Sequence, residues 1–338
     1  MLSRAASNIF WLARYIERAE NTASILKANI EFLMDSETGE NPETSKTWVA
    51  VMKTLDVDKV YIELAAKQPG LTPLSFLTAS PKNPDSLYNC IAQARENARM
   101  VRDQISEKMW LEVNSIYHKI KAEIDDLSWH KDPSALFDRI SRFSFLFQGI
   151  TNATITYGEG HAFYQLGKYL ERGDKTSRIL DLPHYGGDVS GQNQWSEVLN
   201  ASGGRGAYIA EYGVVPKAEN VTNFLIFSED FPRSLRFCFY RVSKMLATIS
   251  RSKVRKRYSN EAERLAGAGL ATIDFTGEEI LEEGGLHEFL DDMQGRFNAI
   301  GQKIFEIYFL IKFESEIDHI LPNKAEATGS LQQSQTQS

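Results

Sequence analysis

One segment of the sequence occurs twice, and this repeat constrains the fold more than any other feature. Residues 10–26 read FWLARYIERAENTASIL, and residues 164–180, 154 positions later, read YQLGKYLERGDKTSRIL. Seven positions are identical without a gap, and most others keep their chemistry. The identical pairs are Leu12/Leu166, Tyr15/Tyr169, Glu17/Glu171, Arg18/Arg172, Thr22/Thr176, Ile25/Ile179 and Leu26/Leu180. We therefore expect two related elements, one in each half of the chain.

Apolar residues in the first copy recur at the spacing of an amphipathic helix. Four polar residues at i, i+3, i+4 and i+7 line the opposite face of that helix. They are Arg14, Glu17, Arg18 and Asn21. Because Phe10 and Ile25 continue this line at its two ends, the pattern favours a partly covered polar site. A solvated face with weak ion pairs is the alternative.

The second copy carries a matching polar set, which we also predict to bind a ligand. Its members are Lys168, Tyr169, Glu171, Arg172 and Asp174. The candidates for acid–base chemistry are Glu17 and Glu171, together with Glu159 and His161 at the start of the second repeat helix. A histidine there is well placed for proton transfer, although a lone histidine near a helix start is more often structural.

A third helix carries a row of arginines. Within ARENARMVRDQI, residues 94–105, Arg95, Arg99 and Arg102 share one helical face, with Glu96 and Asn97 beside them. Like charges at this spacing repel unless anions oppose them. The sequence predicts that Glu17, Glu171, Asp174 or an anionic ligand opposes the row, and an exposed row is the alternative.

A second basic segment precedes another helix. Asp230 is predicted as its N-cap and Pro232 as a first-turn residue, which places Arg233, Ser234 and Arg236 at the helix N-terminus. Free backbone N–H groups with added guanidinium groups favour an anion. The alternative is ordinary capping, with Arg233 paired to a local carboxylate.

Helical periodicity continues through most of the chain, and sustained alternation of apolar and polar residues is absent. The sequence therefore predicts an all-α fold, a large helical bundle with the two repeat helices packed centrally. We expect one helical domain over residues 1–322 and a disordered polar tail over 323–338. The expected helices span 4–34, 47–67, 85–108, 109–127, 133–151, 155–182, 230–250, 260–271 and 286–316, with turns around one short helix in 183–213.

Composition excludes several classes of function. The net charge of −7 gives no general support for nucleic-acid binding, and no apolar run approaches the ~20 residues needed to span a membrane. The two cysteines, Cys90 and Cys238, form no disulfide framework and fit a reducing, cytoplasmic compartment. Glu316 and His319 make the sole Glu-x-x-His motif, so we expect neither a di-metal centre nor a cofactor.

Four blocks in order make the chain similar to the bacterial alpha-E family. They are MLSRAASNIFWLARYIERAENTASIL, ARENARMVRDQIS, GEGHAFYQLGKYLERGDKTSRILD and EDFPRSLRFCF, and they span nearly the whole chain. The resemblance implies an all-helical fold and an association with a circularly permuted ATP-grasp protein and a transglutaminase-like protein. It also implies a setting in peptide or amide-bond synthesis. The chain departs from the family pattern at His161 and Lys168, where many members carry an aromatic residue and an arginine.

Two classes of function follow from these observations, with a third as the plain alternative. The first is a binding and assembly component that holds an anionic small molecule or peptide for an ATP-grasp partner. The second is an enzyme that uses Glu17 or Glu171 as acid or base, with arginines stabilising charge. Excess arginine keeps carboxylates ionised, which favours binding over proton transfer. A purely structural polar network is the third.

Overall fold

The computed structural model of this chain describes residues 1–35, 47–185, 192–251, 258–277 and 285–310, and every regular element within them is helical. Four longer helices of the first half are α1 (Ser3–Asp35), α5 (Leu87–Met100), α6 (Glu107–Asp125) and α7 (Pro133–Thr154). Four of the second half are α8 (Glu159–Leu180), α13 (Leu235–Ile249), α14 (Glu261–Phe275) and α16 (Leu286–Ile304). Shorter elements are α2 (Thr47–Thr54), α3 (Asp58–Ala65), α4 (Pro73–Thr78), η1 (Ser128–Lys131), α9 (Leu182–Tyr185), α10 (Gln192–Ala201), α11 (Arg205–Tyr212), α12 (Ala218–Phe227) and the π-helical turn η2 (Phe305–Phe309). The predicted all-α fold is confirmed.

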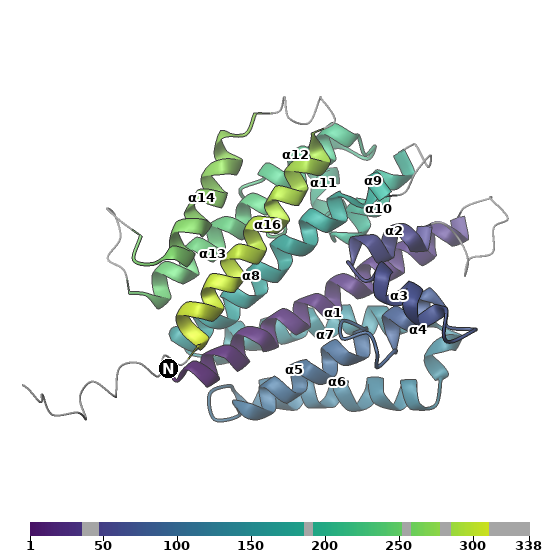
Figure 1. Ribbon diagram of the computed structural model, residues 1–338, viewed down its shortest axis with the longest axis horizontal. Coiled ribbons are helices and arrows are strands. Elements are labelled where there is room, and N and C mark those ends of the chain that lie inside the picture. The colour runs from purple at the N-terminus through teal and green to yellow at the C-terminus, as the bar shows by residue number, and fades with distance from the viewer. Residues whose placement is uncertain (36–46, 186–191, 252–257, 278–284, 311–338) are drawn as a thin grey trace, which may run out of the picture.

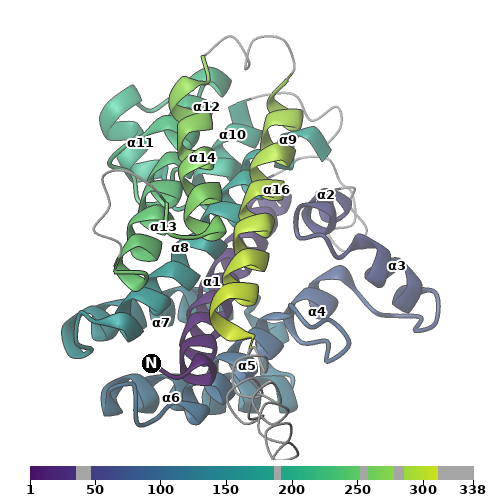
Figure 2. The same cartoon turned by 60° about the vertical axis from the view of Figure 1, so that its left-hand side comes forward.

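The two halves repeat one four-helix arrangement. In the first half α1 packs against α5 and α7, and α6 packs against both α5 and α7. In the second half α8 packs against α13 and α16, and α14 packs against both α13 and α16. Figure 1 shows α1 and α8 running side by side through the middle, with α5 and α6 on one side and α13 and α14 on the other. The turned view of Figure 2 shows the same central pair.

The repeat helices α1 and α8 are parallel, and equivalent levels of the two helices meet. A Cβ on Gly167 would lie 2.3 Å from the carbonyl oxygen of Phe10 and 3.3 Å from the Cβ of Ala13. Ala13 is the repeat counterpart of Gly167, so small residues at equivalent positions let the backbones approach closely. The central packing predicted for the repeat helices is confirmed, and it places both polar faces at one interface.

The starts of α5 and α13 differ from the sequence prediction, and in the same way. The helix N-caps are Ser86 and Ser234, whose hydroxyls accept hydrogen bonds from Asn89 N and Phe237 N. The predicted cap at Asp230 and the start of the helix at residue 85 are therefore wrong. Both segments contain the pattern Pro-x-Ser-Leu-x-x-Cys, at 84–90 and 232–238. This is a second internal repeat, which helical periodicity alone does not reveal. It ends at the buried free thiols of Cys90 and Cys238.

Other boundaries also changed. The helix expected over 47–67 is two helices, because Asp56 takes a left-handed conformation with φ 59° between α2 and α3. The segment 183–213 holds α10 and α11 rather than one short helix, and α12 was missed. The predicted tail at 323–338 and the Glu316–His319 motif lie outside the described residues.

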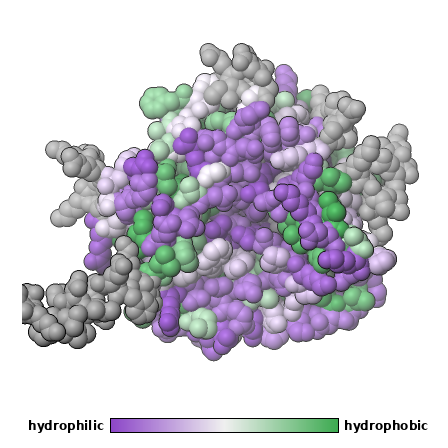
Figure 3. Space-filling view, in the orientation of Figure 1, coloured by the Kyte–Doolittle hydropathy of each residue, from purple (hydrophilic) through white to green (hydrophobic). Residues whose placement is uncertain are grey.

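None of the helices in the described ranges has the length and apolarity required to cross a bilayer. The face shown in Figure 3 is mostly hydrophilic, with hydrophobic residues in smaller groups between the charged ones. The large apolar side chains instead gather between the helices, as with Phe137, Phe239 and Phe297.

Candidate functional site

The two Glu-Arg dipeptides of the repeat exchange partners across α1 and α8. Arg172 donates from Nε and Nη2 to the carboxylate of Glu17, at 2.5 and 3.0 Å. Arg18 donates from Nε and Nη2 to the carboxylate of Glu171, at 2.6 and 3.1 Å. Each glutamate is thus held by the arginine of the other helix, as in an isologous interface between two copies of one surface.

Further charged groups extend this network from both sides. Arg14 Nε donates to Glu171 at 2.7 Å, and Arg18 also pairs with Asp85 at the start of α5. Arg233 enters from the segment before α13. Its Nη2 donates to Glu20 at 2.7 Å, and its Nη1 donates to Asn21 at 3.0 Å and lies 3.8 Å from Glu17. Arg233 thus reaches α1 instead of pairing with a local carboxylate, which was the alternative considered from the sequence.

The two central glutamates are fully buried yet ionised. Glu17 is 1 % exposed and Glu171 is 0 % exposed. Burial alone raises the pKa of a carboxyl group, because it removes water from the charged form. The charges of Arg172 and Arg233 outweigh burial and lower the pKa of Glu17. Arg18, Arg14 and Lys175 hold the pKa of Glu171 well below its usual value. Neither carboxyl group is poised to exchange a proton near neutral pH.

A second group of cations, which we call the basic cluster, surrounds the ring of Tyr169. It consists of Lys168, Arg172 and Arg241. Lys168 Nζ lies 4.4 Å from the ring centroid, and the Cζ atoms of Arg172 and Arg241 lie 5.5 and 5.0 Å from it. Cations around one aromatic ring attract the ring but repel one another, and among the described residues only Arg172 of the three pairs with a carboxylate, so the cluster gains from an added negative charge.

Two members of the basic cluster, Lys168 and Arg241, have donors without partners among the described residues. Lys168 is 5 % exposed, and no hydrogen bond or ion pair to its Nζ occurs in the described part of the chain. Burial, followed by the charge of Arg172, lowers the pKa of Lys168 to about 7. The Nε of Arg241 is buried with no hydrogen-bond partner within the same ranges. Glu17 is near the cluster, but its two oxygens already accept from Arg172.

Neutral polar groups line the same side of α8. Gln165 Nε2 donates to Asn152 Oδ1 at 3.0 Å and lies 3.1 Å from His161 Nε2. Its Oε1 is buried and accepts no hydrogen bond from the described residues. Gln148 links α7 to the network, because its Oε1 accepts from Arg172 and its Nε2 donates to Glu17, both at 3.4 Å.

The equivalent place in the first half is filled by aromatic side chains. Trp11 stands at the repeat position of Gln165, and the Cζ of Arg14 lies 4.8 Å from the Trp11 ring. Phe10 packs against Phe309 with ring centroids 5.3 Å apart. The first half therefore has aromatic side chains at this position. The second half has polar side chains there, with donors that have no partner among the described residues.

The structure places the remaining candidates of α8 at its start. His161 stacks on Tyr157 with ring centroids 4.2 Å apart. Burial and the charges of Lys168 and Arg241 lower the pKa of His161, so its ring is neutral near pH 7. Glu159, in the first turn, accepts from the amino group of Met1 at 2.8 Å.

The arginine row of α5 is not brought to this site. Arg95 donates to Asn114 of α6 and to Glu96, at 2.8 and 2.7 Å, and Arg99 donates to Glu96 at 2.8 Å. Arg102 lies over the ring of Trp110, with its Cζ 4.7 Å from the centroid. The expectation that acidic residues of the repeat oppose the row is wrong.

Four further candidates have partners of their own. Asn97 donates to the Gln93 carbonyl at 2.8 Å. Asp174 accepts from Arg178 at 3.1 Å and pairs with Lys175 at 3.7 Å. Ser234 caps α13, and Arg236 pairs at the surface with Glu229 and Asp274 at 3.1 and 2.7 Å.

Sequence reasoning missed Arg241, Gln165 and Gln148. Arg241 lies two turns after the repeated helix start at Leu235, so alignment of the Pro-x-Ser-Leu-x-x-Cys segments would have placed it beside α8. Its counterpart in the first half is the uncharged Gln93. Gln148 gave no signal in the sequence, because its role depends on where α7 crosses the network.

Comparison with known proteins gives one family. Residues 1–309 match the model of Alpha-E, described as a predicted alpha-helical domain with a conserved ER motif. The dipeptides Glu17–Arg18 and Glu171–Arg172 fit this description, and a third, Glu263–Arg264, lies in α14 outside the repeat.

Curated relatives match only part of the chain. Uncharacterized proteins of Mycobacterium bovis and Mycobacterium tuberculosis are each 25 % identical over 186 residues. The match covers 50 % of this chain and 21 % of each relative, so the chain spans about a fifth of their length. No solved structure matched.

Proposed function

We propose that this chain, which belongs to the Alpha-E family of helical domains, is a binding and assembly component that holds an anionic group at the basic cluster. The observation that carries the proposal is the ammonium group of Lys168, a residue that is 5 % exposed, which has no hydrogen-bond or ion-pair partner among the described residues. A carboxylate or phosphate group supplies the charge and the acceptors that this place lacks.

The ion pairs of the Glu-Arg dipeptides serve as the frame of this site. Arg14, Arg18 and Arg172 already donate to Glu17 or Glu171, so their charges are compensated inside the protein. Such a network fixes the position of α8 against α1 and the orientation of Arg172. The ligand then contacts Lys168 and Arg241, whose donors have no partner among the described residues.

Binding fits the electrostatics better than acid–base catalysis. The pKa values of Glu17 and Glu171 are lowered by the surrounding arginines, so neither carboxyl group carries a proton to donate near neutral pH. A general acid or base works best when its pKa lies near the working pH. The enzyme alternative would therefore require chemistry at His161 or Lys168 instead.

The partner in this proposal follows from the family resemblance. We infer that the chain presents its anionic ligand, a small molecule or peptide, to a circularly permuted ATP-grasp protein, with a transglutaminase-like protein in the same system. An ATP-dependent ligase activates a carboxylate, which is the chemical group that the basic cluster would hold. The cytoplasm is the compartment where such a system has its ATP.

The anion site is tested by calorimetric titration of inorganic phosphate and of citrate at fixed ionic strength. Lys168→Met and Arg241→Met should each weaken binding by about 1.5–3 kcal/mol, the range for a hydrogen bond to a charged group. Arg99→Met is the control, because Arg99 is exposed on α5 and pairs with Glu96. Absence of saturable binding to both anions, or equal binding by all variants, would refute the site.

The partner is tested separately, by affinity purification from the native cell. Recovery of an ATP-grasp protein with wild type and with Lys168→Met would place the partner surface away from the ligand. If no ATP-grasp protein is recovered under crosslinking conditions, the assembly part of the proposal fails, whereas the anion site stands or falls on the titration.

A further inference from the structure

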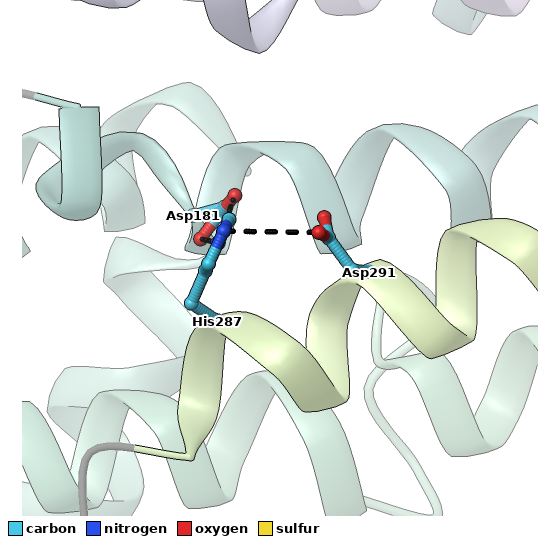
Figure 4. Close-up of side chains that lie close together, drawn as sticks. All are labelled: Asp181, His287 and Asp291. Atoms are coloured by element: carbon cyan, nitrogen blue, oxygen red, sulfur yellow. Dashed lines mark hydrogen bonds and ion pairs between the residues drawn. The ribbon is translucent and has the colours of Figure 1, made fainter.

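The strongest feature outside the basic cluster is a group of metal-ligating side chains where α8 ends beside the start of α16. Asp181 is the C-cap residue of α8, and His287 and Asp291 lie one turn apart on α16. His287 Nδ1 lies 2.9 and 3.0 Å from the two oxygens of Asp181, and its Nε2 lies 3.7 Å from Asp291. Figure 4 shows the imidazole ring between the two carboxylates.

The equivalent positions in the first half of the internal repeat carry a different pair of charges. Asp181 stands 154 positions after Lys27, and Asp291 stands 153 positions after Asp138, which matches the register of the buried residues of α7 and α16. In the first half Lys27 Nζ donates to Asp138 at 2.6 Å. The second half keeps the carboxylate on the last helix but has another carboxylate where the lysine stood.

In place of the lysine, the imidazole of His287 lies between the two carboxylates, and it is charged only when protonated, so these three residues include no permanent counter-ion. The strongest charges acting on His287 are those of Asp181, Asp291 and Glu288. Asp181 is only 3 % exposed, so water compensates its charge poorly. A cation bound between the carboxylates would take the place of the missing lysine charge.

We propose that Asp181, His287 and Asp291 form a binding site for a divalent transition metal ion of the Zn²⁺ type. One ligand atom from each residue lies within 4.8 Å of the others. In a tetrahedral site with bonds of ~2.0–2.2 Å, ligand atoms lie about 3.4 Å apart. The three side chains therefore need to move only modestly to bind one ion. The mixture of one imidazole and two carboxylates favours Zn²⁺, Co²⁺ or Mn²⁺ over Ca²⁺ or Mg²⁺.

The neighbouring histidine is not part of the proposed ligand set. The ring of His184 lies face to face with that of His287, with centroids 3.7 Å apart and planes 8° apart. A stacked ring does not aim its nitrogen at the point between the carboxylates. His184 instead covers one side of the site and leaves the remaining coordination positions to water or to a ligand.

The test is titration of tag-free, metal-free, full-length protein with Zn²⁺ and Co²⁺, followed by calorimetry and by the visible absorption of Co²⁺. Wild type should bind one ion per chain, and Asp181→Asn and His287→Gln should each weaken binding at least tenfold. Asp138→Asn, the matched change in the first half, should bind like wild type. Because His287 is partly exposed, His287→Gln keeps the test informative if Asp181→Asn fails to fold.

Two outcomes would overturn the metal site. One is the lack of saturable Zn²⁺ or Co²⁺ binding by wild type. The other is equal binding by wild type and His287→Gln, which would indicate an adventitious ion only. The basic cluster is a separate group of residues, so neither outcome bears on the proposed anion site.

Discussion

Lys168 stands at the repeat position of Arg14, and only Arg14 has a carboxylate partner among the described residues. Arg14 Nε donates to Glu171 at 2.7 Å beside Arg18, whereas Glu17, the equivalent acceptor, accepts from Arg172 but not from Lys168. At equivalent positions, the first half thus holds a cation that is paired with a carboxylate, and the second half holds a cation with no partner among the described residues. This difference, rather than the presence of charge, is what supports Lys168 as a ligand-binding residue in the proposed function.

Anion binding should depend on pH through Lys168. The pKa of Lys168 is about 7 in the free protein, so its positive charge is lost as the pH rises through that value. Affinity for sulfate, whose own charge is constant in this range, should therefore fall from pH 6 to pH 8, toward tenfold per pH unit at the upper end. Lys168→Arg keeps the charge at all these pH values and should flatten the profile. Equal profiles for the two proteins, measured by calorimetry, would contradict this prediction.

Loss of Glu171 should destabilise the fold far more than loss of a surface glutamate. Glu171→Ala leaves the partly buried Arg14 and Arg18 without their common acceptor, at a cost of ~3–5 kcal/mol. Glu31 has a half-exposed side chain that pairs with Lys27 at 3.8 Å, so Glu31→Ala should cost ~0–1 kcal/mol. Urea unfolding of both variants measures the difference. Similar midpoints would mean that the central ion pairs contribute little.

Acid should destabilise the protein through the same carboxylates. The pKa values of Glu17 and Glu171 are lowered in the folded chain relative to about 4.3 in an unfolded one. Their contribution to stability is complete above the unfolded pKa and is lost as the pH falls through the folded pKa. The free energy of unfolding should thus drop below about pH 4.3. Glu171→Gln should show a shallower drop, while Glu31→Gln should follow wild type.

The close approach of α1 and α8 should make Gly167 intolerant of a side chain. A methyl group in Gly167→Ala would lie 2.3 Å from the Phe10 carbonyl oxygen, which cannot move without separating the two helices. The melting temperature should therefore fall, although alanine favours a helix by ~1 kcal/mol. Gly149→Ala in α7 is the control, because nothing lies within 4 Å of the added group. A rise in melting temperature for both variants would contradict close packing at Gly167.

The repeat made the central helices predictable, because identical residues at a fixed offset require equivalent surroundings. Leu12 and Leu166 are both fully buried, and the two Glu-Arg dipeptides meet as expected. Helix starts were harder to predict. Asn and Asp before proline are common caps, but serine two residues after the proline caps both α5 and α13.

The site was only partly predictable. Periodicity places Arg95 and Arg233 on helical faces with equal clarity, yet it cannot say which face meets which neighbour. Arg233 contacts Glu20 of α1, whereas Arg95 contacts Asn114 of α6. Arg241 appears in the sequence as one more arginine in an amphipathic helix. Its significance depends on the buried ring of Tyr169, a contact between residues far apart in the chain.

The exchange of arginines between α1 and α8 also sets an order of events during synthesis. At ~5–20 residues per second, a ribosome needs roughly 10–30 s to make the chain that separates the two helices. During that interval Glu17 has no Arg172, and the stripe of α1 that packs on α8 has no cover. Until α8 has been made, this surface of α1 is exposed to solvent, to chaperones and to other nascent chains. The ion pairs between α1 and α8 therefore form only after the start of the second half has been made.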